Sequence, residues 1–130
     1  MTLATYQALI DDFVGQAFGL PIAHENAAYV PTQGTAWVAL RVFENEILPV
    51  GLNSVNDTTG VLQFTLYYPD GAGAFDARSM ADTIFSAYPV RRLFARSGQQ
   101  VEITGTDTFD AAPENGWFKL VGRINYRAFV

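Results

Sequence analysis

The join across residues 61–88 constrains the fold of this chain more than any other segment. A strand-like run at 61–68 meets the breaker Pro69-Asp70-Gly71-Ala72-Gly73, and an amphipathic helix pattern follows at 74–88. Apolar residues recur in that helix at the spacing of a single stripe, at positions 77, 80, 81, 84, 85 and 88. The segment therefore predicts a strand, a glycine-rich turn and a helix that buries one side.

The turn has two interpretations. A glycine-rich turn between a strand and a helix can hold a phosphate group at the helix N-terminus. Here Asp76 lies in the first helical turn, where its carboxylate repels a phosphate and already interacts with the helix dipole. We therefore interpret Gly71 and Gly73 as residues that supply a positive φ angle, and we expect no nucleotide or other cofactor.

Periodicity predicts the other elements. A first helix is expected from Leu3 to about Ala17, with Gly19 as its C-terminal cap. Alternation predicts strands and turn residues predict loops. The expected order is a loop at 21–34, a strand at 35–43, a tip at 44–46, a broken strand at 47–55, a strand at 61–68, a strand at 99–105, a polar loop at 107–116 and a closing strand at 117–130.

These elements predict one domain, residues 1–130, of the α+β class. Consecutive strands joined by hairpins favour a mainly antiparallel sheet, and we expect the two helices to pack on one face of it. Only 16% of the residues are charged, and there are ten Phe, six Tyr and two Trp. Such a composition indicates either aromatic residues at interfaces with partners or scattered surface aromatics.

Charge is unevenly spread along the chain. The net charge is −5; residues 1–90 hold two bases and nine acids, whereas residues 91–130 hold six bases and four acids. This asymmetry is compatible with head-to-tail contact between identical subunits. Arg91, Arg92 and Arg96 form a basic cluster, interpreted either as an electrostatic latch to Glu44 and Glu46 of a neighbouring subunit or as a solvated group.

Several kinds of site are disfavoured. The chain has no cysteine and a single histidine, His24, so neither a zinc site nor a Ser-His-Asp triad is expected. Acid pairs lack the spacing of a calcium loop, although spacing alone does not exclude a glycosidase pair. The start shows no signal-peptide pattern, and no apolar run reaches the ~20 residues of a membrane span. We therefore expect neither catalysis nor membrane contact.

The chain resembles the tail terminator proteins of long-tailed bacteriophages, the lambda-type family. The similarity lies in the order of elements rather than in one diagnostic motif. It is carried by Ile10-Asp11-Asp12-Phe13, by Trp37-Val38-Ala39-Leu40-Arg41-Val42, by the turn Leu66-Tyr67-Tyr68-Pro69-Asp70-Gly71-Ala72-Gly73 with its helix, and by the closing strand at 118–126.

The resemblance implies a non-enzymatic virion protein that forms a ring, typically a hexamer. The ring would cap the tail tube protein, end its polymerisation and face the head–tail connector, while DNA passes through the hole. The candidate assembly residues are Glu44, Glu46, Pro69, Gly71, Gly73, Arg91, Arg92 and Arg96. The alternatives are another neck or tail part, such as a head–tail joining or tube protein, or a small-ligand binder or hydrolase.

Overall fold

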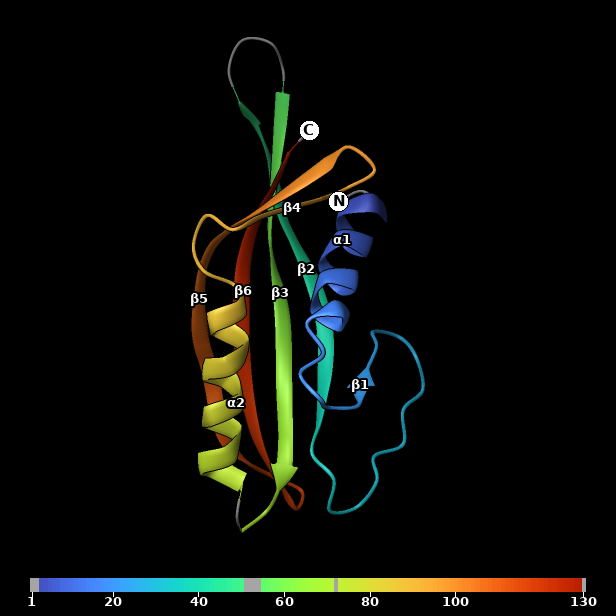
Figure 1. Ribbon diagram of the computed structural model, residues 1–130, viewed down its shortest axis with the longest axis vertical. Coiled ribbons are helices and arrows are strands. Elements are labelled where there is room, and N and C mark those ends of the chain that lie inside the picture. The colour runs from blue at the N-terminus through green and yellow to red at the C-terminus, as the bar shows by residue number, and fades with distance from the viewer. Residues whose placement is uncertain (1–2, 51–54, 72, 130) are drawn as a thin grey trace.

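The computed structural model describes residues 3–50, 55–71 and 73–129. For residues 45–50, 55–57 and 73 it describes the backbone only. The described residues form two helices, each followed by three strands (Figure 1). In chain order they are α1 (Leu3–Gly15), β1 (Ile22–Ala23), β2 (Trp37–Val50), β3 (Val55–Pro69), α2 (Gly73–Ala87), β4 (Leu93–Arg96), β5 (Gln99–Glu114) and β6 (Trp117–Phe129).

All six strands belong to one sheet, in the order β1-β2-β3-β6-β5-β4. The expected α+β class is confirmed. The sheet is nevertheless mixed, because the short β1 runs parallel to β2 while the other neighbouring pairs are antiparallel. Sequence reasoning assigned residues 21–34 to a loop and so missed β1, which has only two residues and therefore no detectable alternation.

The predicted alternation places one set of side chains in the core. Leu62, Phe64 and Leu66 on β3 are fully buried, as expected for one face of that strand. The same holds for Val38 and Leu40 on β2. The rest of the buried cluster is apolar and comes from both helices and from β2, β5 and β6: Ala8, Leu9, Phe13, Val42, Ala77, Ala81, Ile84, Tyr88, Val101, Ile103, Leu120, Ile124, Tyr126 and Ala128.

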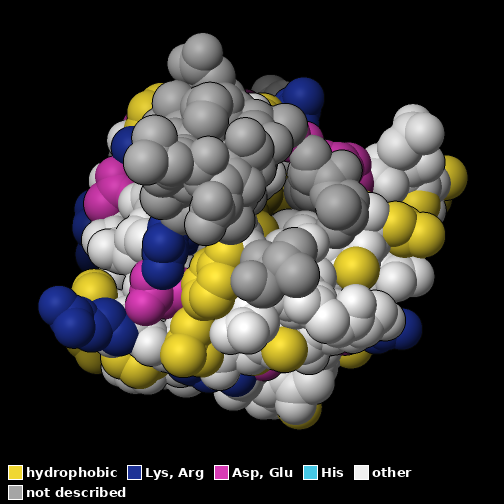
Figure 2. Space-filling model, turned by 90° about the horizontal axis from the view of Figure 1, so that it is seen from above, with side chains coloured by type: hydrophobic (Ala, Val, Ile, Leu, Met, Phe, Trp, Pro, Cys, Tyr) yellow, Lys and Arg dark blue, Asp and Glu magenta, His cyan; other side chains and the backbone are white. Residues whose placement is uncertain are grey.

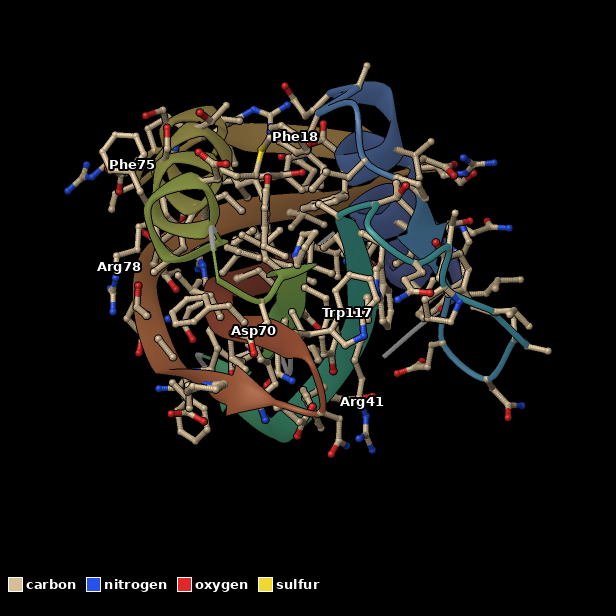
Figure 3. All side chains as sticks on the ribbon, turned by 90° about the horizontal axis from the view of Figure 1, so that it is seen from below. Phe18, Arg41, Asp70, Phe75, Arg78 and Trp117 are labelled. Atoms are coloured by element: carbon tan, nitrogen blue, oxygen red, sulfur yellow. The ribbon has the colours of Figure 1, made fainter. Side chains whose placement is uncertain are left out.

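Phe64 lies at the centre of this cluster. Its ring centroid is 6.3 Å from that of Phe13 in α1 and 5.4 Å from that of Phe85 in α2. Beneath it lies Gly122 of β6, where an added Cβ would come 2.2 Å from Phe64 Cζ. The glycine therefore leaves the space that the aromatic ring occupies. Seen along the strands, the sheet curls around these buried side chains (Figure 3).

The central join has the predicted order of strand, turn and helix, although Gly73 is the first residue of α2 and not a residue of the turn. Gly71 has a φ of 93°, a conformation that glycine adopts without strain. The helix then begins at Gly73, and Ala77, Ala81 and Ile84 bury its predicted stripe. The turn is also held by the hairpin between β5 and β6, since the Asp70 N–H donates to Gly116 O at 3.1 Å.

Several predicted boundaries are wrong, among them the start of the strand at 61–68, since β3 already begins at Val55. The first helix ends at Gly15, because Ala17 rather than Gly19 leaves the helical conformation first, with a φ of 53°. Residues 47–50 form no separate strand, since β2 continues to Val50, and the prediction for residues 51–54 lies outside the described residues. The polar stretch at 107–116 is mostly strand: β5 runs to Glu114, and only Asn115-Gly116 forms a tight hairpin turn.

The reason for the missed half of β5 is local. Register shifts between Ile103 and Gly105 and between Thr108 and Asp110 break the period-two pattern. The side chains of Asp107, Thr108 and Phe109 are also exposed, so the stretch carries no buried alternation.

Candidate assembly surfaces

The sheet has two edges that are only partly covered. On β5, the strand β4 pairs with residues 99–102, and Arg91 and Arg92 exchange backbone hydrogen bonds with Ile103 at 2.7 and 3.0 Å. Beyond that, in the described part of the chain, residues 104–114 have no strand on their outer side. On the opposite edge, β1 pairs with β2 only at Val38 and Ala39.

The direction of the backbone groups at the β5 edge follows from one side-chain contact. The Val42 N–H donates to Glu25 Oε1 at 3.3 Å, on the side of β2 away from β3. Val42 and its opposite, Leu62, are therefore a non-hydrogen-bonded pair, so the backbone of Leu62 points toward Ile124. Ile124 in turn points toward β3, which leaves Thr106 opposite it with its N–H and C=O directed outward.

The face of the sheet opposite the core carries flat stacks of arginine on aromatic rings. The guanidinium of Arg41 lies 4.6 Å from the Phe43 ring centroid, and that of Arg123 lies 4.4 Å from the Phe109 centroid. Phe109 is a large apolar side chain that is 60% exposed. These pairs hold arginine side chains in fixed positions on an open surface, as cation–π contacts do.

Cations of β6 on this face are neutralised by acids of β5. Arg123 pairs with Asp107 at 2.7 Å. Arg127 pairs with Glu102 at 3.1 Å and Lys119 with Glu114 at 3.3 Å. The ladder of β5 and β6 is thus also a ladder of cross-strand ion pairs, each of modest strength because the groups are partly exposed.

An aromatic cluster occupies the lower end of the same face. Trp37 stacks on Tyr67 at 4.2 Å between ring centroids and meets Tyr29 at 5.0 Å and the edge of Trp117 at 6.2 Å. Beside it is a hollow of ≈ 540 Å³, and Figure 3 shows Trp117 and Asp70 at this end. The hollow is lined by Pro31, Gln33, Gly34, Pro69, Asp70, Asn115, Gly116 and Trp117. Among the predicted assembly residues whose side chains the structure describes, only Pro69 lines it.

The basic cluster is placed differently from the simple latch that the sequence suggested. Both terminal nitrogens of Arg92 bind Asp12 of α1, at 2.6 and 2.7 Å, and Arg92 Nη1 also donates to Ala87 O at 3.3 Å. Arg96 pairs with Asp11. Sequence reasoning did not find these partners, because about 80 residues separate them and nothing local links them.

The Arg92 site also shifts two ionisation equilibria. The hydrogen bond to Asp12 raises the pKa of Arg92, with a further contribution from the charge of Asp12. Burial raises the pKa of Tyr88 well above its usual value, and the nearby Asp12 charge adds to this. The Arg92 guanidinium lies 5.2 Å from the Tyr88 ring centroid. This site therefore joins α1, the end of α2 and β4 within one subunit.

The remaining candidates lie at separate places. Arg91 is exposed and has a φ of 75°, a positive value held by the hydrogen bond from its N–H to Ile103 O. Glu44 is exposed on β2, whereas the side chain of Glu46 lies outside the described residues. Burial raises the pKa of Tyr126 to about 12, and the charge of Glu44 contributes.

The upper end of the molecule carries charges of both signs. Figure 2 views this end and shows basic and acidic side chains interspersed with hydrophobic ones on the described part of the surface. His24 is exposed, and the described residues hold no group of three or more acids and histidines suited to a metal ion. Among the described helices, none has the length and apolarity that crossing a membrane requires.

The geometry is therefore that of an α+β domain with one curled sheet, partly open edges and ion pairs along an exposed face. A family model described as "Phage tail terminator protein" matches residues 4–126. The chain belongs to the phage tail terminator family, which makes it a structural protein of the phage tail, located in the virion.

Comparison of structures agrees on the fold. One solved structure superposes with a TM-score of 0.74 at 19% sequence identity, covering 98% of this chain and 92% of that chain. At that identity the likeness concerns the fold alone. A search of curated protein sequences found no significant match.

Proposed function

We propose that this protein is a tail terminator that acts by assembly and has no catalytic centre. Six copies form a ring that caps the tube of tail tube protein, ends its polymerisation and presents its other side to the head–tail connector. The family match over residues 4–126 carries this proposal. A net charge of −5 is in keeping with a channel through which DNA passes without being held.

The sheet edges support closure into a ring. Since β2, β3, β6 and β5 are successive antiparallel neighbours, β5 runs opposite to β2. A rotation about the ring axis that brings β5 of one subunit beside β2 of the next places the two strands in the antiparallel orientation. Such a head-to-tail contact uses two different surfaces of each subunit. It gives a closed ring when the rotation from one subunit to the next is a whole fraction of 360°.

The helices leave this contact accessible. Phe64 touches both Phe13 of α1 and Phe85 of α2, which supports the proposal that both helices cover the same face of the sheet. The opposite face, with Arg41 and Arg123 on it, then remains for contacts outside the subunit. Of the basic cluster, Arg91 remains exposed, and we propose that it pairs with Glu44 or Glu46 of a neighbouring subunit.

Electron microscopy and sedimentation of the purified protein, alone and with tail tube protein, test the proposal. We expect single closed rings of six subunits, and tubes that end in one such ring and no longer grow. Long tubes from the protein alone would identify a tube protein instead. A chain that stays strictly monomeric at high concentration would contradict the ring.

A proline at the open edge provides a sharper test. Thr108 lies two residues beyond Thr106 in the same register, so its N–H also points outward. Thr108→Pro removes that donor without removing a hydrogen bond between β5 and β6. We expect a folded subunit whose rings dissociate at concentrations where the wild type remains assembled.

The matched control is the neighbouring residue. Asp107 points its backbone toward β6, so Asp107→Pro removes an internal hydrogen bond and is expected to lower the stability of the subunit itself. Circular dichroism and urea unfolding separate the two effects. Rings of Thr108→Pro as stable as those of the wild type would show that the β5 edge is not the interface.

A further inference from the structure

The segment after α1 covers the lower edge of β2 by two different means. Its strand β1 pairs with Val38 and Ala39, and Pro21 O accepts the Val38 N–H at 3.0 Å. At Val42, four residues beyond Val38, no strand among the described residues pairs with this edge of β2. There the carboxylate of Glu25 accepts the Val42 N–H instead. The side chain thus occupies a backbone donor that a neighbouring strand would otherwise bind.

Glu25 is also held in this position by charge. Its Oε1 lies 3.9 Å from Nε of Arg41, the residue just before Val42 on the same strand. The Glu25 side chain is 33% exposed, so the contact is accessible to solvent but not fully screened. Charged side chains at a strand edge are one means by which proteins prevent unwanted pairing.

The open stretch of the β2 edge and the open stretch of the β5 edge lie at different heights along the strands. Through the registers of β6 and β3, the open residues 104–114 of β5 are level with residues 37–43 of β2, which β1 and Glu25 cover. Residues 44–50 of β2, which no strand among the described residues covers on the outer side, are level with residues 99–103 of β5, which β4 and the Arg91–Arg92 segment cover. Direct side-by-side pairing of two subunits is therefore blocked at both levels.

We infer that Glu25 is an edge guard: it closes the lower edge of β2 to a second copy of this chain, so that β5 of the next subunit pairs with the upper part of β2 in a staggered register. The inference rests on the proposed ring. The centres of the two open stretches differ by about seven residues, or roughly 23 Å along a strand. Crossing four strands spans roughly 19 Å, so the strands incline by roughly 50° to the ring axis.

This inclination is close to what closed sheets require. Strands in barrels tilt by about 35–45°, and the stagger between first and last strand sets that tilt. Glu25 therefore selects the register in which β5 of one subunit pairs with β2 of the next. Through that register it also sets the strand inclination in the closed ring. Without it, the Val42 N–H, which lies just beyond the stretch that β1 covers, can bind an incoming strand in a second, level register.

The first measurement concerns the isolated subunit and needs no ring. Amide hydrogen exchange of Val42, followed by NMR at dilution, is expected to be about fivefold faster in Glu25→Ala than in the wild type. Glu25→Gln keeps an oxygen acceptor and is expected to stay near the wild type. Glu114→Ala, which removes an exposed acid paired with Lys119 on β6, is the control and should leave Val42 exchange unchanged.

The second measurement is the distribution of assemblies by sedimentation and electron microscopy. The wild type and Glu25→Gln should give one ring species, whereas Glu25→Ala should add larger, heterogeneous species from the second register. Equal Val42 exchange in all variants, or faster exchange with an unchanged distribution, would overturn the guard.

The two proposals fail in different ways. A wild type that never associates contradicts the ring but leaves the guard open to test. In that case Glu25→Ala must itself begin to associate, and an alanine variant that also stays monomeric counts against the guard.

Discussion

The space beneath Phe64 makes the strongest stability prediction. Gly122→Ala would place a Cβ 2.2 Å from Phe64 Cζ and 2.7 Å from both Cε atoms. Ordinary carbon contacts lie at about 3.5–4.0 Å, so the ring must move by roughly 1.5 Å. It has nowhere to go, because Phe64 is 0% exposed and is in contact with the rings of Phe13 and Phe85.

The expected cost follows from overpacking. Extra methyl groups in a full core destabilise by about 1–3 kcal/mol, and the severity of this overlap places Gly122→Ala toward the upper end. The reduced chain entropy of alanine relative to glycine offsets about 0.5–1 kcal/mol of that. A net loss of about 2 kcal/mol follows, which corresponds to a fall in Tm of roughly 8 °C for a domain of this size.

Urea unfolding at concentrations where the chain is monomeric measures this loss without a contribution from assembly. Gly105→Ala on the adjacent strand is the control: its nearest neighbouring atom, Asn125 Nδ2, is 3.9 Å away, so we expect a change within about 0.5 kcal/mol. Phe64→Leu should rescue Gly122→Ala, with a coupling of about 1 kcal/mol in the double-mutant cycle. Gly122→Ala as stable as wild type, or additive with Phe64→Leu, would refute the reasoning.

Three further predictions concern charge and ionisation. Asp12→Asn leaves Arg92 with a neutral partner at a partly buried site and should lower the free energy of unfolding by about 2 kcal/mol in urea titrations; no change would mean that the pair is solvated. The folded pKa of Tyr126, about 12, exceeds its ordinary value of 10.0, so neutral Tyr126 favours the folded state. Its contribution is complete below pH 10.0 and disappears as the pH rises through about 12, and Tyr126→Phe should reduce alkaline unfolding over that window; an identical pH profile would argue against it. Finally, Arg91→Glu should weaken the ring in sedimentation without altering subunit stability, and an unchanged assembly would exclude the latch.

Alternation and turn chemistry made most of the fold predictable. The buried face of β3 and the stripe of α2 follow from periods of two and 3.6 residues, which any covered strand or helix must show. The positive φ of Gly71 was likewise predicted, because it lies in a turn and glycine adopts that conformation without strain. Where the period is interrupted, as at the two register shifts of β5, sequence reasoning replaced a strand by a loop.

The candidate assembly surfaces were much less predictable. Sequence reasoning interpreted Arg92 and Arg96 as part of either a latch to a neighbouring subunit or a solvated cluster. It did not find the pairs that they form within the chain with Asp12 and Asp11 of α1. The contact of Glu25 with the Val42 N–H had no sequence signal, because any acid in a polar loop looks solvated until its position beside a strand edge is known.

By itself, the sequence determined the class of fold, the buried residues of its regular elements and the resemblance to tail terminators, because these depend on local periodicity and on the order of elements. Only the tertiary structure decided which strand edges are covered and which acids meet which arginines. Those properties depend on contacts between segments distant along the chain, and packing of the whole sheet brings them together.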